Sequence, residues 1–197
     1  MPANDSGFDT YIALRFEMEQ NLAVAGGPNL DLINHVKCSD IPNPQLPLEL
    51  YPRALYRVHF SHGSYTSYKS NLGFRCTKAG YINLQNYGEL AYGIRNHLRW
   101  QPKPSSFIST FVSRKHALNW ARKRLRQGKY GRAYIMKIDP REITNAEGGL
   151  LPILKLSDVI EDYPGILRGV DKERIRNEYL ALYIIPASAI LYVSRVK

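Results

Sequence analysis

Three short stretches of the sequence place charged or hydroxyl side chains inside apolar runs. Arg57 lies in the β-prone run of residues 55–60, Ser109 and Thr110 lie in a second run of this kind, and Glu178 opens a third. An arginine in such a run suits an anion-binding cleft, because burial of its charge is costly without a partner. Small hydroxyls at the end of a strand can orient a catalytic carboxylate or contact the ribose of a ligand. We therefore treat these four residues as candidates for chemistry.

Each candidate also has an ordinary structural interpretation. Arg57 could be the partner of a cross-strand ion pair, or it could lie at an exposed edge. Ser109 and Thr110 could be strand hydroxyls bonded to the backbone. Glu178 could be an exposed acid at the start of a strand. The residues alone leave these alternatives open.

The elements that must position these residues indicate a mixed α+β domain. In the run of residues 55–60, alternation places Arg57 and His59 on one face and Tyr56 and Val58 on the other. Ser113 is a candidate N-cap for a helix that ends near Gly128. A further helix is expected over residues 84–100, and residues 158–174 are expected to form a long, partly helical loop. We predict strands over residues 55–60, 73–75, 107–111, 133–138, 150–156, 178–185 and 189–193.

The first 50 residues are predicted to form an N-terminal arm, and residues 51–197 the main domain. Two helices, over residues 8–25 and 30–36, are expected in the arm, with Gly26-Gly27 ending the first of them. A proline-rich connector follows at residues 41–52. We assign no chemistry to this arm.

The order of these motifs resembles the R-S-E class of mono-ADP-ribosyltransferases, which includes the A subunits of cholera toxin and heat-labile enterotoxin. The shared pieces are an L-Y-R strand, an F-x-S-T strand followed by a helix, and a glutamate that opens a late strand. The strand AYIMKIDP and the segment NEYLALYIIPASAILYV are also similar to that class. The sequence resembles a fungal domain family of unknown function as well. The resemblance covers roughly residues 52–196 and implies a split antiparallel β-sheet core with flanking helices.

This resemblance implies that NAD is the substrate and that the bond between nicotinamide and ribose is cleaved, with no metal required. Glu178 would be the catalytic carboxylate, and Ser109 would hydrogen-bond it, with Thr110 in support. Arg57 would hold the phosphate–ribose part of NAD. The backbone of Val58 would face the nicotinamide amide, and His59 would be a neighbour of the cleft. The implied activity is that of a toxin-like or effector-like NAD-dependent mono-ADP-ribosyltransferase, with transfer to a macromolecule or to water.

Two positions depart from the motifs of that class. Phe111 replaces the last serine of F-x-S-T-S, and Arg176 occupies the position two residues before the catalytic glutamate. Glutamate there is associated with arginine acceptors, and glutamine with other acceptors that include nucleobases. Because a cation cannot act as a general base, ordinary transfer to arginine is not expected. Transfer to an anionic or nucleic-acid acceptor, hydrolysis of NAD, or a degenerate fold without turnover stay open. The loop before Glu178, which includes Tyr163, would present the acceptor.

The positive charge is concentrated in one segment. The formal net charge is +10, and residues 95–132 contain no Asp or Glu but carry Lys or Arg at positions 95, 99, 103, 114, 115, 122, 123, 124, 126, 129 and 132. Such a segment suits a polyanion, or it is a solvated helix face. A basic nucleic-acid- or protein-binding module is therefore the alternative to an enzyme. The polyanion contact would use Arg114, Lys115, Arg122, Lys123, Arg124 and Arg126.

Length and composition limit the domain number, the kinds of cysteine site and the cellular locations that we expect. A chain of 197 residues with two cysteines fits one domain with an appended arm, without a disulfide framework or a cysteine metal site. Free thiols are expected, although one bridge stays possible. No signal peptide and no apolar run long enough to span a bilayer are visible. We expect an intracellular protein of the cytoplasm or nucleus, with secretion by another route still open. RNA 2′-phosphotransferases, also users of NAD, are a more distant alternative.

Overall fold

The computed structural model describes residues 45–62, 66–77, 82–99, 104–128, 130–162 and 175–197. The chain divides into two compact units, residues 1–41 and residues 42–197, and every described residue lies in the second unit. The helices predicted over residues 8–25 and 30–36 lie outside the described residues. The boundary predicted after residue 50 stays a prediction.

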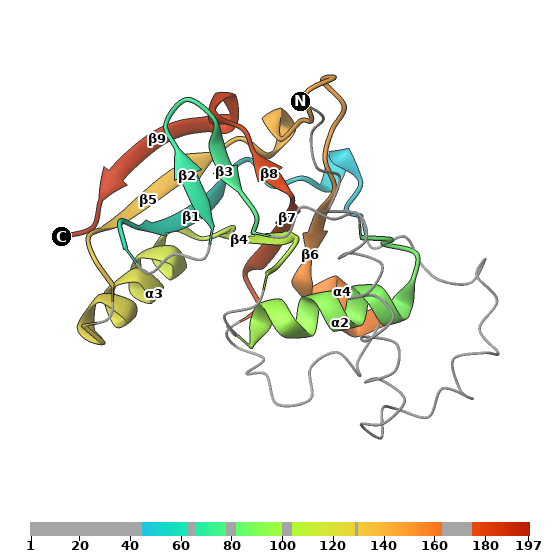
Figure 1. Ribbon diagram of the computed structural model, residues 1–197, viewed down its shortest axis with the longest axis horizontal. Helices are drawn as coiled ribbons and strands as arrows, with labels where there is room; N and C mark the ends of the chain where they lie inside the picture. The colour runs from blue at the N-terminus through green and yellow to red at the C-terminus, as the bar shows by residue number, and fades with distance from the viewer. Residues whose placement is uncertain (1–44, 63–65, 78–81, 100–103, 129, 163–174) are drawn as a thin grey trace, which may run out of the picture. The chain divides into compact units, whose positions relative to one another are not determined.

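Two antiparallel sheets form the domain, which confirms the predicted α+β class (Figure 1). The larger sheet has the strand order β6-β7-β4-β1-β5-β9, and the smaller sheet has the order β2-β3-β8. The bounds of the larger sheet's strands are β1 Leu55–Phe60, β4 Phe107–Phe111, β5 Ala133–Ile138, β6 Ile153–Lys155, β7 Glu178–Leu182 and β9 Ile190–Arg195. The smaller sheet contains β2 Ser67–Lys69, β3 Gly73–Arg75 and β8 Ile184–Ile185.

Two helices begin directly after an N-cap residue, and the helix expected over residues 84–100 is shorter than predicted. In α2, Tyr87–Leu98, the Asn86 side chain accepts a hydrogen bond from the Glu89 N–H at 3.1 Å. In α3, Arg114–Arg126, Ser113 is the N-cap as predicted, and its Oγ accepts from the His116 N–H at 3.2 Å. α4 spans Leu156–Asp162. Three single turns of 3-10 helix complete the described elements: η3 Leu48–Leu50, η4 Pro140–Glu142 and η6 Ala187–Ala189.

Strand β1 separates two hydrophobic clusters. Val58 and Phe60 pack with Ala117 and Ala121 of α3, which covers β1 and β5 (Figure 1). Leu55 packs with a second cluster that includes Phe74 of β3. The alternation predicted for β1 is confirmed, because Arg57 and His59 both lie against the Phe74 ring.

The prediction of one continuous strand over residues 178–185 is wrong. Tyr183 has φ 61°, a backbone conformation that is strained for a bulky residue, and it divides the segment into β7 and β8. Its N–H donates to the Ser106 carbonyl at 2.9 Å, and its carbonyl accepts from the Cys76 N–H at 2.8 Å. These two hydrogen bonds hold Tyr183 between the segments that contain Ser106 and Cys76, and tertiary contacts of this kind can maintain a strained backbone conformation.

The strand predicted over residues 150–156 is shorter than expected. Strand β6 covers Ile153–Lys155, and Leu156 already begins α4. The last strand, β9, also runs two residues beyond the predicted end at residue 193.

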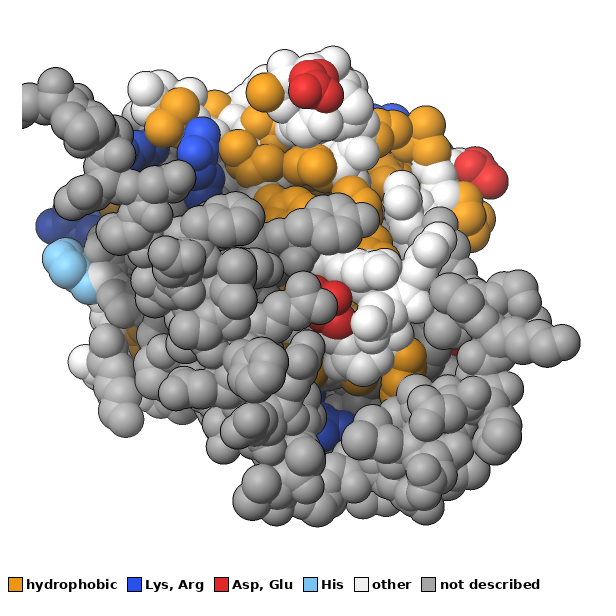
Figure 2. Space-filling model, turned by 45° about the vertical axis from the view of Figure 1, so that its right-hand side comes forward, with side chains coloured by type: hydrophobic (Ala, Val, Ile, Leu, Met, Phe, Trp, Pro, Cys, Tyr) orange, Lys and Arg blue, Asp and Glu red, His pale blue; other side chains and the backbone are white. Residues whose placement is uncertain are grey.

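Apolar and basic side chains occupy different parts of the described surface. Leu48, Leu50 and Leu150 are exposed, and Figure 2 shows hydrophobic side chains gathering on one face of the molecule. The exposed residues of α3, in contrast, are polar or charged. The surface is thus apolar in one area and strongly basic along α3.

Candidate active site

The site is built where β1 and β4 diverge. These neighbouring strands are paired at Tyr56 and Phe111. The Val112 N–H donates to the Asn177 carbonyl at 3.1 Å, so even-numbered residues of this segment direct their backbone groups toward β7. The odd-numbered Ser109 therefore directs its carbonyl toward β1, where the side chain of Arg57 reaches it.

The Arg57 guanidinium bridges the gap between the two sheets. Its Nη1 donates to the Ser109 carbonyl oxygen at 2.6 Å, and its Nη2 donates to Thr66 Oγ1. The guanidinium carbon lies 5.5 Å from the centre of the Phe74 ring. Burial lowers the pKa of Arg57 to about 10, and the negative charge of Glu178 offsets part of this shift. Arg57 therefore remains a fixed cation at neutral pH.

Glu178 is a buried carboxylate at the first position of β7, with 5% of its surface exposed. It lies opposite Phe111, and Leu180 lies opposite Ser109, so Glu178 and Ser109 are diagonal neighbours on one face of the sheet. The electrostatic influence of Glu178 on Arg57 shows that the two opposite charges lie near one another. Ser109 and Glu178 thus share one face of the sheet, and the Arg57 guanidinium comes from the neighbouring strand β1 and reaches the backbone carbonyl of Ser109.

The other candidates on β4 and β1 surround this point. The buried Thr110 hydroxyl donates to the Tyr179 carbonyl at 3.0 Å, so it links β4 to β7. The Ser61 N–H donates to the carbonyl of Arg132, the residue directly before β5. The odd-numbered residues of this segment therefore direct their backbone groups toward β5. The backbone groups of the even-numbered Val58 are directed toward β4. The Val58 side chain packs in the core beneath α3.

Two polar atoms beside the site are buried and have no hydrogen-bond partner among the described residues. They are Nε of Arg57 and Nδ1 of His59. The His59 ring is surrounded by aromatic rings, with centroids 5.1 Å from Tyr68 and 5.7 Å from Phe74. Buried polar groups normally have a partner, so a polar ligand or water is needed here.

Burial lowers the pKa of His59, and the positive charge of Arg57 lowers it further; burial also lowers the pKa of His116. In the unfolded chain both pKa values return to about 6.5. The unfolded state then binds more protons than the folded state below that pH, so acidification destabilises the fold.

We therefore expect the free energy of unfolding, measured in urea, to fall between about pH 7.5 and about pH 5.5. His59→Gln and His116→Gln should each reduce this pH dependence. The control is His62→Gln at an exposed position. Equal pH dependence in all four proteins would contradict the assignment.

His97 of α2 also contacts Ser109, although it was not among the residues predicted from the sequence. Its Nε2 lies 2.6 Å from Ser109 Oγ, and its Nδ1 lies 2.7 Å from Ser105 Oγ. With Nε2 protonated, His97 donates to Ser109, and the Ser109 hydroxyl is then available to donate onward to a carboxylate or a ribose. A signal was present, because His97 follows Leu90 and Ile94 at helical spacing on the apolar face of α2.

His97 is therefore expected to be a positioning residue for Ser109. For the NAD cleavage that the motif resemblance implies, His97→Ala should lower kcat by about 10- to 100-fold, as is typical when the partner that orients a site residue is lost, with a smaller change in KM. His97→Gln, which keeps a hydrogen-bonding group, should recover part of the loss. His62→Ala is the matched control, and an unchanged kcat for His97→Ala would contradict this role.

The proposed acceptor side of the site is described in part. Arg176 is exposed in the turn that leads into β7, and the carbonyl of Asn177, between Arg176 and Glu178, accepts a hydrogen bond from the Val112 N–H. Tyr163 lies outside the described residues.

Among the residues that the structure describes, no group of three or more His, Cys, Asp and Glu is placed to hold a metal ion. None of the described helices has the length and hydrophobicity needed to cross a membrane.

The chain belongs to the family described as a domain of unknown function (DUF7587), whose model matches residues 50–197. No curated protein matches the sequence. Among solved structures, the chain is similar to EcPltA, at 19% identity and a TM-score of 0.48 over 73% of this chain and 75% of that one. It is also similar to a mutant of heat-labile enterotoxin, at 21% identity and a TM-score of 0.41 over 72% and 66% of the two chains.

Proposed function

We propose that this member of the DUF7587 family is an NAD-dependent mono-ADP-ribosyltransferase that cleaves the nicotinamide–ribose bond. One observation supports the proposal most: Arg57, Ser109 and Glu178 lie on three adjacent strands, Arg57 bonds the Ser109 carbonyl, and the charge of Glu178 acts on Arg57. The motif order that resembles the R-S-E transferases predicts the same three residues. NAD is a substrate here, and ADP-ribose is transferred to a macromolecule or to water.

Cleavage of the nicotinamide–ribose bond requires a negative charge near the ribose. As the bond between ribose C1′ and the nicotinamide nitrogen breaks, its electron pair leaves with nicotinamide, and positive charge develops on the ribose. A buried carboxylate such as Glu178 stabilises that charge more strongly than a carboxylate in water does. The acceptor atom then bonds to C1′ and releases a proton.

The remaining groups hold the substrate and the carboxylate. Arg57 offers a cation and an unpartnered Nε for the anionic diphosphate. The Val58 backbone is directed toward β4, where it can bond the nicotinamide amide. Ser109, held by His97, provides a hydroxyl on the same face as Glu178. Each of these contacts fixes the geometry before the reaction and lowers the cost of reaching the transition state.

The acceptor side argues against transfer to arginine. Arg176 lies exposed at the position two residues before Glu178, and its positive charge would repel a guanidinium and cannot remove its proton. An anionic acceptor, a nucleic acid or water is compatible with a cation at this place.

The experiment is to incubate the full chain with NAD and to measure nicotinamide by chromatography, with and without cell lysate. Lysate protein, DNA and RNA are then searched for added ADP-ribose by mass spectrometry. Nicotinamide release without modification indicates an NAD glycohydrolase. No release under either condition would overturn the proposal and favour the alternative, a catalytically inactive fold that acts as a basic binding module, which the α3 surface supports.

A further inference from the structure

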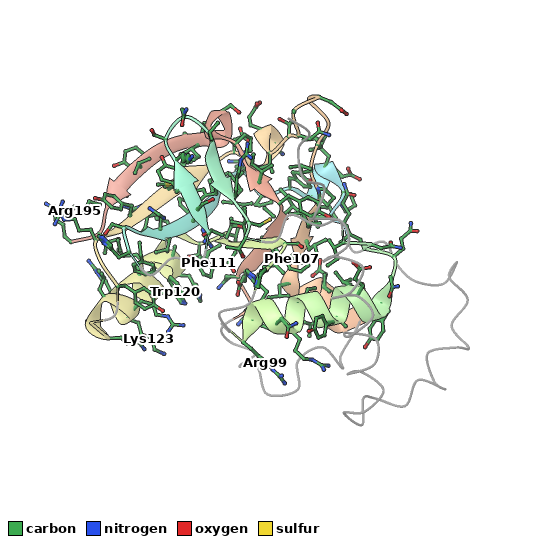
Figure 3. All side chains as sticks on the ribbon, in the orientation of Figure 1. Arg99, Phe107, Phe111, Trp120, Lys123 and Arg195 are labelled. Carbon is green, nitrogen blue, oxygen red and sulfur yellow. The ribbon has the colours of Figure 1, made fainter. Side chains whose placement is uncertain are left out.

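We propose that α3 is a docking surface for the phosphate backbone of a nucleic acid, independently of the NAD reaction. Lys115, Arg122 and Arg126 follow one another at spacings of seven and four residues, which places them on one side of the helix. Asn119 lies between them on the same side, and Lys123 borders it. Figure 3 shows the Lys123 side chain extending outward from α3, away from the sheet. We call these five residues the α3 stripe.

The α3 stripe is continuous, exposed and free of negative charge. All five residues are exposed, and the helix contains no Asp or Glu. From residue 115 to residue 126 the stripe is about 16 Å long, because each helical residue rises about 1.5 Å. That length covers several phosphates of one strand.

The first turn of α3 adds a second, independent observation. Arg114 and Lys115 are the first two residues of the helix, where the helix dipole is positive and disfavours cations. Both are exposed, and an i,i+4 carboxylate that could neutralise them is absent from α3. An arrangement that costs helix stability is explained if an anion occupies this end.

The chemistry of the stripe favours a nucleic acid over a membrane or a protein. A membrane-binding helix needs an apolar face, but the apolar residues of α3, such as Ala117 and Ala121, pack into the core. Protein interfaces have an apolar or aromatic centre and are depleted of lysine, whereas the exposed residues of α3 are cations and Asn119. A row of cations without apolar neighbours matches a polyphosphate backbone.

A further basic residue of α3, Arg124, stacks on aromatic rings. Arg124 lies over the Trp120 ring at 5.4 Å and near the Tyr130 ring at 6.0 Å. Arg124 therefore packs on aromatic rings at a different side of α3 from the stripe and is not one of the stripe residues.

The test is binding of fluorescein-labelled single-stranded RNA, single-stranded DNA and duplex DNA of about 20 nucleotides, followed by fluorescence anisotropy. The triple variant Lys115→Glu/Arg122→Glu/Arg126→Glu is expected to bind at least about tenfold more weakly. Its plot of log affinity against log salt concentration, measured between about 50 and 200 mM, should be shallower by about 2.7 for duplex DNA and by about 2.1 for single strands, which is about 0.9 or about 0.7 for each of three lost contacts. The unfolding temperature serves as the control for folding.

The matched control reverses three exposed cations elsewhere, Arg53→Glu/Lys69→Glu/Arg141→Glu, with the same change in net charge. It should keep most of the affinity and the salt dependence. Equal loss in both triple variants would overturn the proposal, because net charge alone would then explain binding. No binding of any oligonucleotide by the unchanged chain, or stronger binding to vesicles of anionic phospholipid or to polyglutamate, would also overturn it.

Discussion

Replacing Glu178 with glutamine is expected to slow nicotinamide release from NAD by about 10²- to 10³-fold, which corresponds to about 3–4 kcal/mol of transition-state stabilisation. The substitution keeps the shape and hydrogen-bonding capacity of the side chain and removes its charge. Because the negative charge matters in the transition state and much less in the ground state, kcat should fall while KM changes little. Single-turnover assays with chromatographic detection of nicotinamide measure this directly.

Glu161→Gln is the matched control, because it makes the same chemical change at an exposed position of α4. Its rate should equal that of the unchanged chain. If Glu178→Gln retained the full rate of NAD cleavage, Glu178 could not be the catalytic carboxylate, and the site would have to be sought elsewhere.

Replacing Arg57 with alanine is expected to destabilise the fold by about 3 kcal/mol, in addition to weakening NAD binding. Two hydrogen bonds are lost, including the 2.6 Å bond to the Ser109 carbonyl, and the buried Glu178 loses a nearby positive charge. In the Arg57→Ala background, Glu178→Gln should then restore part of the stability, because it removes a buried charge that no longer has Arg57 nearby. Urea unfolding of the four proteins of this double-mutant cycle gives the coupling energy.

Arg53→Ala is the control for this cycle, since Arg53 is exposed and its loss should change stability by less than about 0.5 kcal/mol. Strict additivity of Arg57→Ala and Glu178→Gln would show that the two charges do not interact. It would remove the electrostatic link between β1 and β7 on which the site depends.

The sequence was most informative where one local rule decided the structure. The apolar runs around Arg57 and Ser109 predicted β1 and β4, and Ser113 predicted the start of α3, because alternation and capping are local properties. Tyr183 was not predictable, since its positive φ is maintained by bonds to Ser106 and Cys76, far away in the sequence. The apolar residues of 178–185 predicted one continuous strand, but the tertiary contacts of Tyr183 interrupt it.

The candidate site shows the same division. Residue types and motif order identified Arg57, Ser109 and Glu178, but the sequence did not indicate that Arg57 bonds the Ser109 backbone or that His97 contacts the Ser109 hydroxyl. Both contacts depend on how β1 and β4 diverge and where α2 packs. Residue spacing carries no information about either, except for the position of His97 on an apolar helix face.

The most direct test of the central claim is a crystal structure of the Glu178→Gln protein with NAD, since this variant should bind the substrate without cleaving it. We predict that the diphosphate lies within hydrogen-bonding distance of Arg57, and that the ribose bonded to nicotinamide lies between Ser109 and residue 178. NAD bound at another place, or no NAD bound at saturating concentration in crystals and in solution, would contradict the account.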